Sequence, residues 1–413
     1  MEPLPKSNQC ESREEQCGSN SARYDNYRMY YVDIDTEDHV KIFQEIEERS
    51  DSFTFYGHAR HPGQKLTIMV AAGKVAEMTD ILSTYGVNYK ILTYNFQEKI
   101  DRQWNDVMPV DTSPEDFDWD HYFHLKTINA WLEKLAAEYD FLEIIEMGES
   151  VEGIPIKGVK LAKNPENTAI FVESGIHARE WIAPATATYI LNELLTSKDP
   201  AVQKIASDFN WIIFPVVNPD GYKYTFEADR MWRKNRGLFG TCRGVDLNRN
   251  FPHHWNESGA SSEPCRYDFA GPSEASEAET KAIIKYINEN AEDLKIRTYL
   301  SLHSFSQLVM FPYGTEEKAY NFDDLTEIGL KAVEAIKETT GKIYKSGSLR
   351  DTIYPSSGGS KDWAHGHAKI PITFTFELRG APDSQDLFIL PADQIRDTGR
   401  ETLAAFIAIL EGA

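Results

Sequence analysis

The sequence predicts a large α/β domain preceded by a small α+β domain, and three observations lead to this prediction. Past residue 117, helical patterns alternate with apolar, strand-like runs, which is typical of an α/β sheet with helices on both faces. Residues 28–94 instead follow the order strand-helix-strand-strand-helix-strand, which fits a small ferredoxin-like sandwich. The polar stretch 95–116 interrupts both patterns, so we place the boundary between the domains there.

The small domain is predicted from periods of two and of 3.6 residues. The turn-prone His61-Pro62-Gly63 separates its two middle strands. Because this stretch offers no nucleophile and no metal cluster, we interpret it as a packing or inhibitory domain. Its strands are RMYYVDI, SFTFYG, KLTIMVA and the end of YGVNYKILTY, and its helices are EDHVKIFQEIEE and residues 75–85.

The large domain is predicted from a helix over 125–139 and a series of apolar runs. In sheets of this kind, functional residues gather at the carboxyl ends of the strands, where the motifs described below lie. The strand-like runs are LEIIEMG, PIKGVKLA, TAIFVES, WIIFPVV, RTYLSLH and PITFTFE.

The charge balance excludes several classes of partner. The chain has 413 residues, with 43 Lys and Arg against 65 Asp and Glu, which gives a net charge of −22. Nucleic acids and anionic membranes require clustered basic residues, so we expect neither as a partner. No run approaches the ~20 apolar residues of a membrane span. We expect a monomer.

The cysteines and one sequon favour a secreted protein. Cys242 and Cys265 enclose a loop rich in Gly, Ser, Asn and Pro, which suits a disulfide better than a metal site. The glycosylation sequon at 256–258 lies inside that loop. No apolar leader follows Met1, so either a signal peptide is missing from this sequence or the protein is cytosolic with free thiols. The pattern assigns no role to Cys10 and Cys17.

The stretch SGIHAREW (174–181) predicts part of a metal site. Gly175 allows a tight turn after an apolar strand, and a helical pattern follows from Trp181. His177 and Glu180 lie three residues apart on this turn, so an imidazole and a carboxylate can converge on one ion. Taken alone, the same pair is more often found as helix-cap residues at a surface.

Six further motifs follow in order, and together they favour the metal site over the helix-cap interpretation of His177 and Glu180. With them the chain resembles the zinc carboxypeptidase A/B family in its secreted zymogen form: about residues 24–100 resemble the pro-domain and about 113–413 the peptidase. The resemblance implies a mixed-sheet α/β/α peptidase domain behind an α+β pro-domain. The motifs are NPDGY (218–222), MWRKNR (231–236), GVDLNRNF (244–251), SLHSFSQLVMFPYG (301–314), TIYPSSGGSKDW (352–363) and FTFELRG (374–380).

The resemblance implies four segments: a flexible tail over 1–24, an inhibitory pro-domain over 25–98, an activation linker over 99–113 and a catalytic domain over 114–413. Cleavage of the linker would release the latent enzyme. Within it, Lys99 and Arg102 would be open to a trypsin-like protease if the linker is exposed.

The resemblance also implies the metal ligands. His303, at the end of RTYLSLH, would join His177 and Glu180 in holding one Zn²⁺. Three protein ligands with an open position are the pattern of a catalytic zinc site. Asp246 resembles the carboxylate that orients the first histidine.

Catalytic roles follow by the same resemblance. Glu377, on an otherwise apolar strand, would act as general base toward the attacking water, and Arg233 would stabilise the developing oxyanion. The alternatives are structural: Glu377 could form a salt bridge with Arg379, and Arg233 could be a surface cation.

An exopeptidase must recognise the terminal carboxylate of its substrate. Asn248 and Arg249 suit that task, since a guanidinium grips a carboxylate with two parallel hydrogen bonds. Tyr354 resembles a mobile lid tyrosine, and Arg179 a residue that contacts the substrate upstream of the scissile bond. Phe305 stands where the family usually has a tyrosine.

Specificity is where this sequence departs from the family pattern. Lys361 takes a position that is apolar in A-type enzymes and acidic in B-type enzymes. An unpaired buried ammonium is costly, so we expect a preference for acidic terminal residues, glutamate above all. The alternative is that Lys361 extends to solvent, which would leave an A-type pocket for aromatic and aliphatic residues. The predicted pocket residues are Gly314, Leu349, Ser356, Lys361 and Thr375.

The sequence therefore predicts a secreted zinc metallocarboxypeptidase precursor that removes single C-terminal residues from peptides and proteins. The rival from another class is an inactive zinc protein that captures peptide C-termini. A pure binder would need neither Glu377 nor Arg233.

Overall fold

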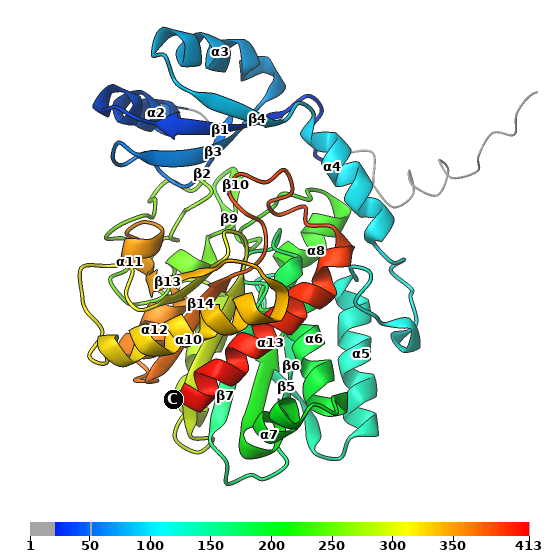
Figure 1. Ribbon diagram of the computed structural model, residues 1–413. Coiled ribbons are helices and arrows are strands. Elements are labelled where there is room, and N and C mark those ends of the chain that lie inside the picture. The colour runs from blue at the N-terminus through cyan, green and yellow to red at the C-terminus, as the bar shows by residue number, and fades with distance from the viewer. Residues whose placement is uncertain (1–20, 50–51, 413) are drawn as a thin grey trace, which may run out of the picture.

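The computed structural model describes residues 21–49 and 52–412, and it has two stacked parts (Figure 1). A small domain built on a four-stranded sheet lies above a large domain built on an eight-stranded sheet. Most of the predicted tail, including Cys10 and Cys17, lies outside the described residues.

The small domain has the predicted order of elements and an antiparallel sheet in the order β2-β3-β1-β4. Alternate residues of β1 serve two cores: Tyr30, Val32 and Ile34 pack under the helices, and Met29 packs against the large domain. Its elements are β1 (Arg28–Ile34), α2 (Glu37–Arg49), β2 (Phe53–Tyr56), β3 (Gln64–Val70), α3 (Val75–Thr84) and β4 (Tyr89–Thr93).

The large sheet is mixed, as the resemblance implied, with the strand order β13-β12-β14-β11-β7-β8-β6-β5. The neighbours β14, β11, β7 and β8 run parallel, and β12, β6 and β5 are joined to the sheet by antiparallel pairs. Its strands are β5 (Leu142–Glu149), β6 (Pro155–Leu161), β7 (Ala169–Ser174), β8 (Asn210–Phe214), β11 (Ile296–His303), β12 (Leu308–Phe311), β13 (Lys345–Ser348) and β14 (Ile372–Glu377).

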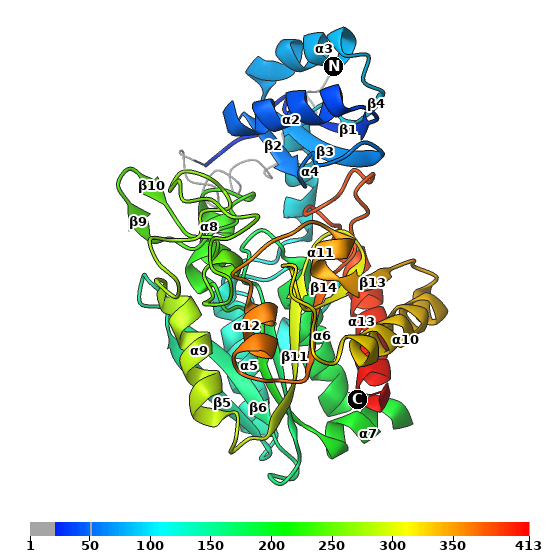
Figure 2. The ribbon, with the colours of Figure 1, turned by 90° about the vertical axis from the view of Figure 1, so that its left-hand side faces the viewer.

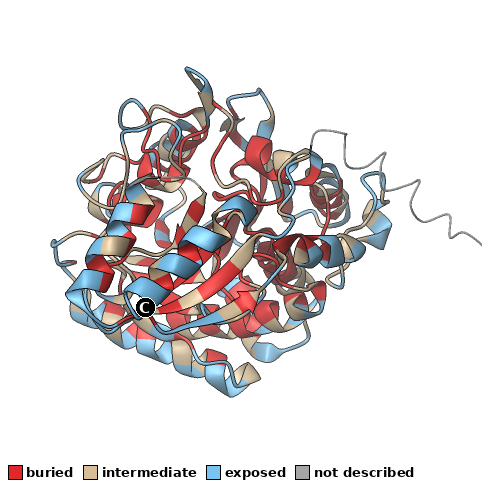
Figure 3. Ribbon diagram, turned by 90° about the horizontal axis from the view of Figure 1, so that it is seen from above, coloured by how far each residue is buried: buried red, intermediate tan, exposed pale blue. Residues whose placement is uncertain are grey.

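Helices cover both faces of this sheet, so the predicted α/β class is confirmed (Figure 2). Alternation along β7 separates the cores: Ile170 and Val172 belong to one, Ala169 and Phe171 to the other. The outer faces of the helices are exposed (Figure 3), and the central strands β7 and β8 are buried along their whole length. The first core is covered by α5 (Leu125–Glu138), α6 (Ile182–Thr196), α7 (Pro200–Asp208), α10 (Phe322–Thr340) and α13 (Ile395–Gly412), and the second by α9 (Ala278–Asn290) and α12 (Ser360–Gly366).

No helix within 21–49 and 52–412 is long and apolar enough to cross a membrane. Shorter elements complete both domains and the connection between them. They are α8 (Pro219–Glu227), β9 (Leu238–Phe239), β10 (Cys242–Arg243), α11 (Leu349–Thr352) and the 3-10 turns Ala72–Lys74, Trp104–Asp106, Pro114–Asp116, Leu247–Arg249 and Ala392–Gln394.

The connection between the domains starts as a helix. Helix α4 (Phe96–Gln103) descends from the small domain toward the large one, so residues 99–103 of the predicted linker are helical (Figure 1). Phe96, Ile100 and Gln103 are buried, and Gln103 Nε2 donates to the carbonyl of Leu390 at 2.9 Å. Tertiary packing of one face therefore extends the helix into a polar stretch.

Strand direction determines where chemistry can occur in this fold. Because β7, β11 and β14 are parallel neighbours, their carboxyl ends meet at one edge of the sheet. His303 and Glu377 are the last residues of β11 and β14 and are paired in register. The predicted catalytic groups thus come together at the edge that faces the small domain.

Candidate active site

The turn after β7 brings His177 and Glu180 to this edge. Gly175 has a φ of +65°, and a Cβ there would lie 3.1 Å from the carbonyl oxygen of Pro215. Glycine is therefore the residue that fits this turn. The Glu180 amide donates to the carbonyl of His177 at 3.3 Å, which closes the turn before α6 begins at Ile182.

Three buried side chains converge as a metal site would require. His177 Nδ1 lies 2.9 Å from Glu180 Oε1 and 3.0 Å from His303 Nδ1, which lies 3.0 Å from Glu180 Oε2. A tetrahedral site with bonds of 2.0–2.1 Å needs ligand atoms about 3.3 Å apart. Two imidazole nitrogens facing each other beside a carboxylate are stable with a shared cation between them. The donor set therefore fits zinc.

Asp246 connects this triad to Arg233. Its Oδ1 lies 3.0 Å from His177 Nε2 and also accepts from the Asn248 amide, and its Oδ2 accepts from Arg233 Nε and Nη2 at 3.0 and 2.8 Å. Burial alone would raise the pKa of Asp246, but Arg233, His177 and Arg249 outweigh it and hold that pKa well below its usual range. An ionised Asp246 accepts a hydrogen bond from the Nε2–H of His177, which leaves Nδ1 unprotonated and free to bind a metal.

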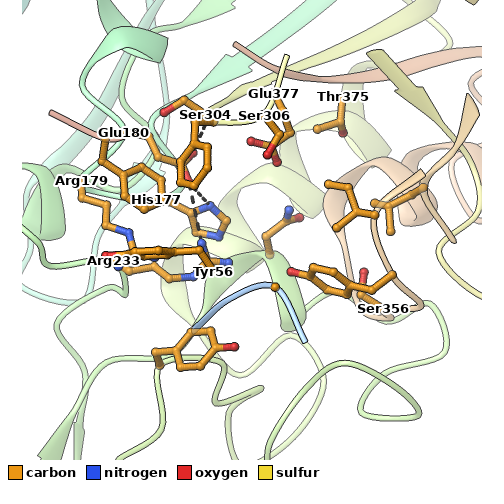
Figure 4. A pocket seen from close by; sticks show the side chains of 18 of the residues that line it. Tyr56, His177, Arg179, Glu180, Arg233, Ser304, Ser306, Ser356, Thr375 and Glu377 are labelled. Atoms are coloured by element: carbon orange, nitrogen blue, oxygen red, sulfur yellow. Dashed lines mark hydrogen bonds and ion pairs between the residues drawn. The ribbon is translucent and has the colours of Figure 1, made fainter. Parts of the chain in front are cut away.

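Glu377 faces the same cavity as the triad (Figure 4). The alternative salt bridge is not present: Arg379 Nε and Nη2 donate to Glu401 at 2.9 and 2.7 Å, and Nη1 donates to Gln394 at 2.7 Å. Burial, with a further contribution from Glu180, raises the pKa of Glu377 to about 8. A divalent cation on the triad would favour the ionised form that a general base requires.

Neither of the two predicted arginines near the triad lies at the surface: Arg179 is buried, and the Arg233 side chain is only 13% exposed. Arg233 Nη1 is 3.7 Å from Glu180 Oε1 in addition to its bonds with Asp246, so the alternative of a surface cation does not hold. The guanidinium of Arg179 lies over the Phe388 ring, 4.1 Å from its centroid. Both side chains line the cavity.

Asn248, Arg249 and Tyr354 also line the cavity. Arg249 Nη2 donates to the Tyr354 hydroxyl at 3.2 Å, and its Nε donates to the carbonyl of Gly259 at 2.7 Å. Asn248 Nδ2 lies 3.5 Å from His303 Nε2. The Arg249 fork is thus held in place before any substrate binds.

The predicted specificity pocket is only partly reproduced. Leu349, Ser356 and Thr375 line the cavity, but Gly314 and Lys361 do not. Lys361 is buried and its ammonium pairs with Asp362 Oδ1, so the premise of an unpaired cation is wrong. Asp362 Oδ2 accepts from the Gly314 amide at 2.8 Å. Asp362, the residue next to Lys361, thus supplies the countercharge, which the sequence did not predict.

The small domain closes the cavity from above. Phe55, Tyr56 and Gly57 line it together with the catalytic groups, and Figure 4 shows the ring of Tyr56 in front of them. Phe305, the residue without the family's hydroxyl, packs its ring 5.9 Å from that of Tyr56. The His58 ring lies edge-on to Tyr354 at 4.8 Å. This domain therefore occupies the space that a substrate would need.

Several cavity-lining residues were missed by the sequence analysis, because they carry no chemistry that a motif would reveal. The structure also joins Cys242 to Cys265 in a disulfide with Cα atoms 5.1 Å apart, so these two thiols are not free. The additional lining residues are Tyr267, Ser304, Ser306, Met310, Ile353 and Phe388.

Comparisons with known proteins agree with this geometry. Residues 128–405 match the zinc carboxypeptidase family, and residues 30–103 match the carboxypeptidase activation peptide. Zinc carboxypeptidase A 1 of Anopheles gambiae is 41% identical over 393 residues, covering 94% of this chain and 90% of that protein. Carboxypeptidase B of Rattus norvegicus is 33% identical, covering 92% of each. The crystal structure of carboxypeptidase A from Helicoverpa armigera superposes with a TM-score of 0.84 at 29% identity, covering 94% of this chain and 98% of that one.

The fold and the converging triad define a zinc-dependent hydrolase with an N-terminal activation domain. The chain belongs to the zinc carboxypeptidase family, and its activation domain makes it a zymogen. It is therefore an enzyme that uses zinc and acts on peptide C-termini, and the alternative of an inactive binder falls away. Relatives of both the A and the B type match it, so family membership leaves its preferred terminal residue open.

Proposed function

We propose that His177, Glu180 and His303 hold the zinc ion and that Glu377 and Arg233 perform the catalytic roles of a carboxypeptidase. The observation that carries this proposal is the convergence of the two Nδ1 atoms and the Glu180 carboxylate within about 3 Å of one another. When bound, zinc supplies Lewis-acid polarisation of the scissile carbonyl and makes water more acidic.

The chain's own residues supply proton transfer and charge stabilisation. Glu377 lies at the end of β14 beside the triad, where its carboxylate takes a proton from the attacking water and returns it to the leaving amine. Arg233 is held by Asp246 through two hydrogen bonds and presents its remaining nitrogen toward the triad, where negative charge develops on the substrate. Because both groups are largely enclosed by the cavity wall and the small domain, these interactions act in a medium less polar than water.

Binding of the terminal carboxylate is assigned to Asn248, Arg249 and Tyr354. Arg249 Nε and Nη1 donate to the carbonyls of Gly259 and Asn248, and these two bonds fix the plane of the guanidinium. The third nitrogen, Nη2, donates to the Tyr354 hydroxyl. A substrate carboxylate would replace the Tyr354 hydroxyl on that third nitrogen, and Tyr354 would then close over the terminus. Arg179, which lines the same cavity, would contact the peptide upstream of the cleaved bond.

We further propose a preference for acidic terminal residues, with glutamate first. Among the described residues, Asp362 is the one hydrogen-bond acceptor that Lys361 Nζ reaches, so two of its three donors are left for a ligand. Asp362 is tied to the Gly314 amide, and the Gly314 carbonyl accepts from Ser356 in the cavity wall. These contacts link the buried Lys361–Asp362 pair to the cavity wall, which supports the proposal that a second carboxylate is favoured on that side.

An A-type preference is the second candidate, and one observation favours it. The Lys361–Asp362 pair is formally neutral, and the wall in front of it includes Leu349, Ile353 and Met310. A neutral, largely apolar pocket would take aromatic or aliphatic residues.

A peptide series separates these candidates. Three peptides that differ only in a terminal Glu, Phe or Arg are incubated with the activated enzyme, with and without a zinc chelator. We expect chelator-sensitive release with Glu fastest, and at least a tenfold loss of Glu release in Lys361→Met, the equivalent of about 1.4 kcal/mol. Lys369→Met, at an exposed lysine beyond α12, is the matched control. Faster release of Phe than Glu would select the A-type candidate.

Activation and location complete the proposal. Within 99–113 the basic residues are Lys99 and Arg102: Lys99 is partly buried and paired with Asp386 at 3.3 Å, and Arg102 is exposed in the last turn of α4. We therefore assign cleavage by a trypsin-like protease to the bond after Arg102. The Cys242–Cys265 disulfide supports secretion, because such bonds persist in oxidising surroundings. The monomeric state stays a prediction.

A further inference from the structure

A second group of metal-ligating side chains lies outside the catalytic cavity. It consists of His253 and His254, in the loop after Arg249, and Glu317, in the loop between β12 and α10. The ligand atoms of the three side chains all lie within 4.8 Å of one another. None of them lines the catalytic cavity.

The geometry resembles that of a metal site more than that of an ordinary ion pair. His254 Nε2 is 3.1 Å and His253 Nε2 is 3.5 Å from the same carboxylate oxygen, Glu317 Oε2. These separations bracket the ~3.3 Å between ligand atoms of a tetrahedral zinc site. His253 is buried, and its Nε2 has no hydrogen-bond partner among the residues that the structure describes. A buried nitrogen of this kind is costly unless a ligand binds it.

Both imidazoles are oriented by their surroundings. His254 Nδ1 lies 2.8 Å from Glu257 Oε2, and a carboxylate in this position fixes the tautomer that leaves Nε2 free for a metal. The His253 ring stacks on Tyr313, with 4.8 Å between centroids and 25° between planes. Gly366 lies against the edge of the His253 ring, and any larger residue there would clash, because its Cβ would lie 2.5 Å from His253 Cε1.

We propose that His253, His254 and Glu317 bind a second zinc ion, which holds the loop of residues 251–259 against the loop of residues 312–321. Two imidazole nitrogens and one carboxylate oxygen suit a divalent transition ion such as zinc, with a fourth position open to solvent.

The position of this site gives it a structural role next to the terminal pocket. The His253 carbonyl accepts from the Gly358 amide at 3.0 Å, and the Ser258 carbonyl accepts from the Ser357 amide at 2.9 Å. The joined loops therefore support the segment that carries Tyr354 and Ser356. A metal here would stiffen the wall of the pocket without touching the reacting groups.

The test is the zinc content of the full chain, measured by elemental analysis after equilibration with a zinc buffer at micromolar free zinc. We expect two zinc ions per chain in the wild type and one in both His254→Asn and Glu317→Gln, whose side chains are partly exposed and replaceable without disturbing the core. The catalytic zinc is identified separately as the ion lost in His177→Ala.

Two matched controls keep the test specific. His121, like His254, pairs with a carboxylate three residues away and is about one-third exposed, but no third ligand joins that pair in the described part of the chain. Glu316 is the exposed neighbour of Glu317 and pairs with Arg350. His121→Asn and Glu316→Gln should both retain two ions. One ion in the wild type, or two in His254→Asn and Glu317→Gln, would overturn the proposal and leave the cluster as an ion pair.

Discussion

Replacement of Asp246 by asparagine tests how the zinc triad is held. In the wild type, Asp246 Oδ1 accepts from His177 Nε2 and the Asn248 amide, and Oδ2 accepts twice from Arg233. Asparagine has one oxygen for these two groups of donors. If its oxygen stays on Arg233, its NH₂ faces His177 Nε2, which must then lose its proton and place it on Nδ1, the atom that would bind zinc.

The magnitude follows from the geometry of this contact. Loss of a carboxylate that orients a metal-bound histidine typically weakens metal binding 10–100-fold, or about 1.4–2.7 kcal/mol. If the amide rotates instead, its NH₂ faces the largely buried Arg233, which has also lost its charged partner, and this costs about 3–5 kcal/mol of stability. Either orientation thus damages the site, in zinc affinity or in stability.

The assay is a competition titration of the tightly bound zinc against a chelator, with thermal unfolding measured in parallel. Asp268→Asn is the matched control, because Asp268 is also buried and accepts from an arginine, Arg266 at 3.2 Å, without contacting a ligand of the triad. A zinc dissociation constant for Asp246→Asn within twofold of the wild type, at unchanged stability, would refute the reasoning.

Three further predictions concern activation and stability. Arg102→Gln should abolish activation by trypsin and Lys99→Gln should not, as gel shift and N-terminal sequencing would show. Activation of Arg102→Gln at the wild-type rate would contradict the assignment of the cleaved bond. Glu401→Gln should destabilise the fold by about 3–5 kcal/mol, because it removes the buried partner of Arg379 and leaves only the half-exposed Asp397 at 3.8 Å; unfolding monitored at constant zinc content would measure this. Burial raises the pKa of Glu279 from 4.5 to about 7. The folded state therefore holds this proton more tightly than the unfolded chain, and the protonated Glu279 contributes up to about 3 kcal/mol to the free energy of unfolding. This contribution is complete below about pH 4.5 and is lost as the pH rises to 7. Glu279→Gln should lose this part of the pH dependence, and an unchanged profile of stability against pH would contradict it.

The strand ends could be predicted from the sequence because their signal is local. Apolar runs ending in a polar residue, such as RTYLSLH and PITFTFE, mark both the strand and its carboxyl end. Parallel pairing then brings His303 and Glu377 together, as the register confirms. The resemblance supplied the residue roles, which neither the spacing nor the composition contains.

The environment of Lys361 could not be predicted in the same way. The sequence shows that a lysine occupies this position, but not which neighbour its flexible side chain contacts. In the structure that neighbour is Asp362, the next residue. The α4 helix was missed for a related reason: only docking of Phe96 and Ile100 against other parts of the chain reveals that its polar sequence has a buried face. His253 and His254 contact Glu317 from a loop more than 60 residues away in the sequence, and no local sequence pattern predicts that contact.

The most direct measurement of the central claim combines zinc content with turnover in Glu377→Gln. This change keeps the shape of the side chain and removes the base without touching a ligand of the triad. The account predicts that activated Glu377→Gln contains as much zinc as the wild type and that its kcat falls by at least 10²-fold on every peptide of the series. A variant with full zinc content and wild-type kcat would contradict the assignment of Glu377 as the base.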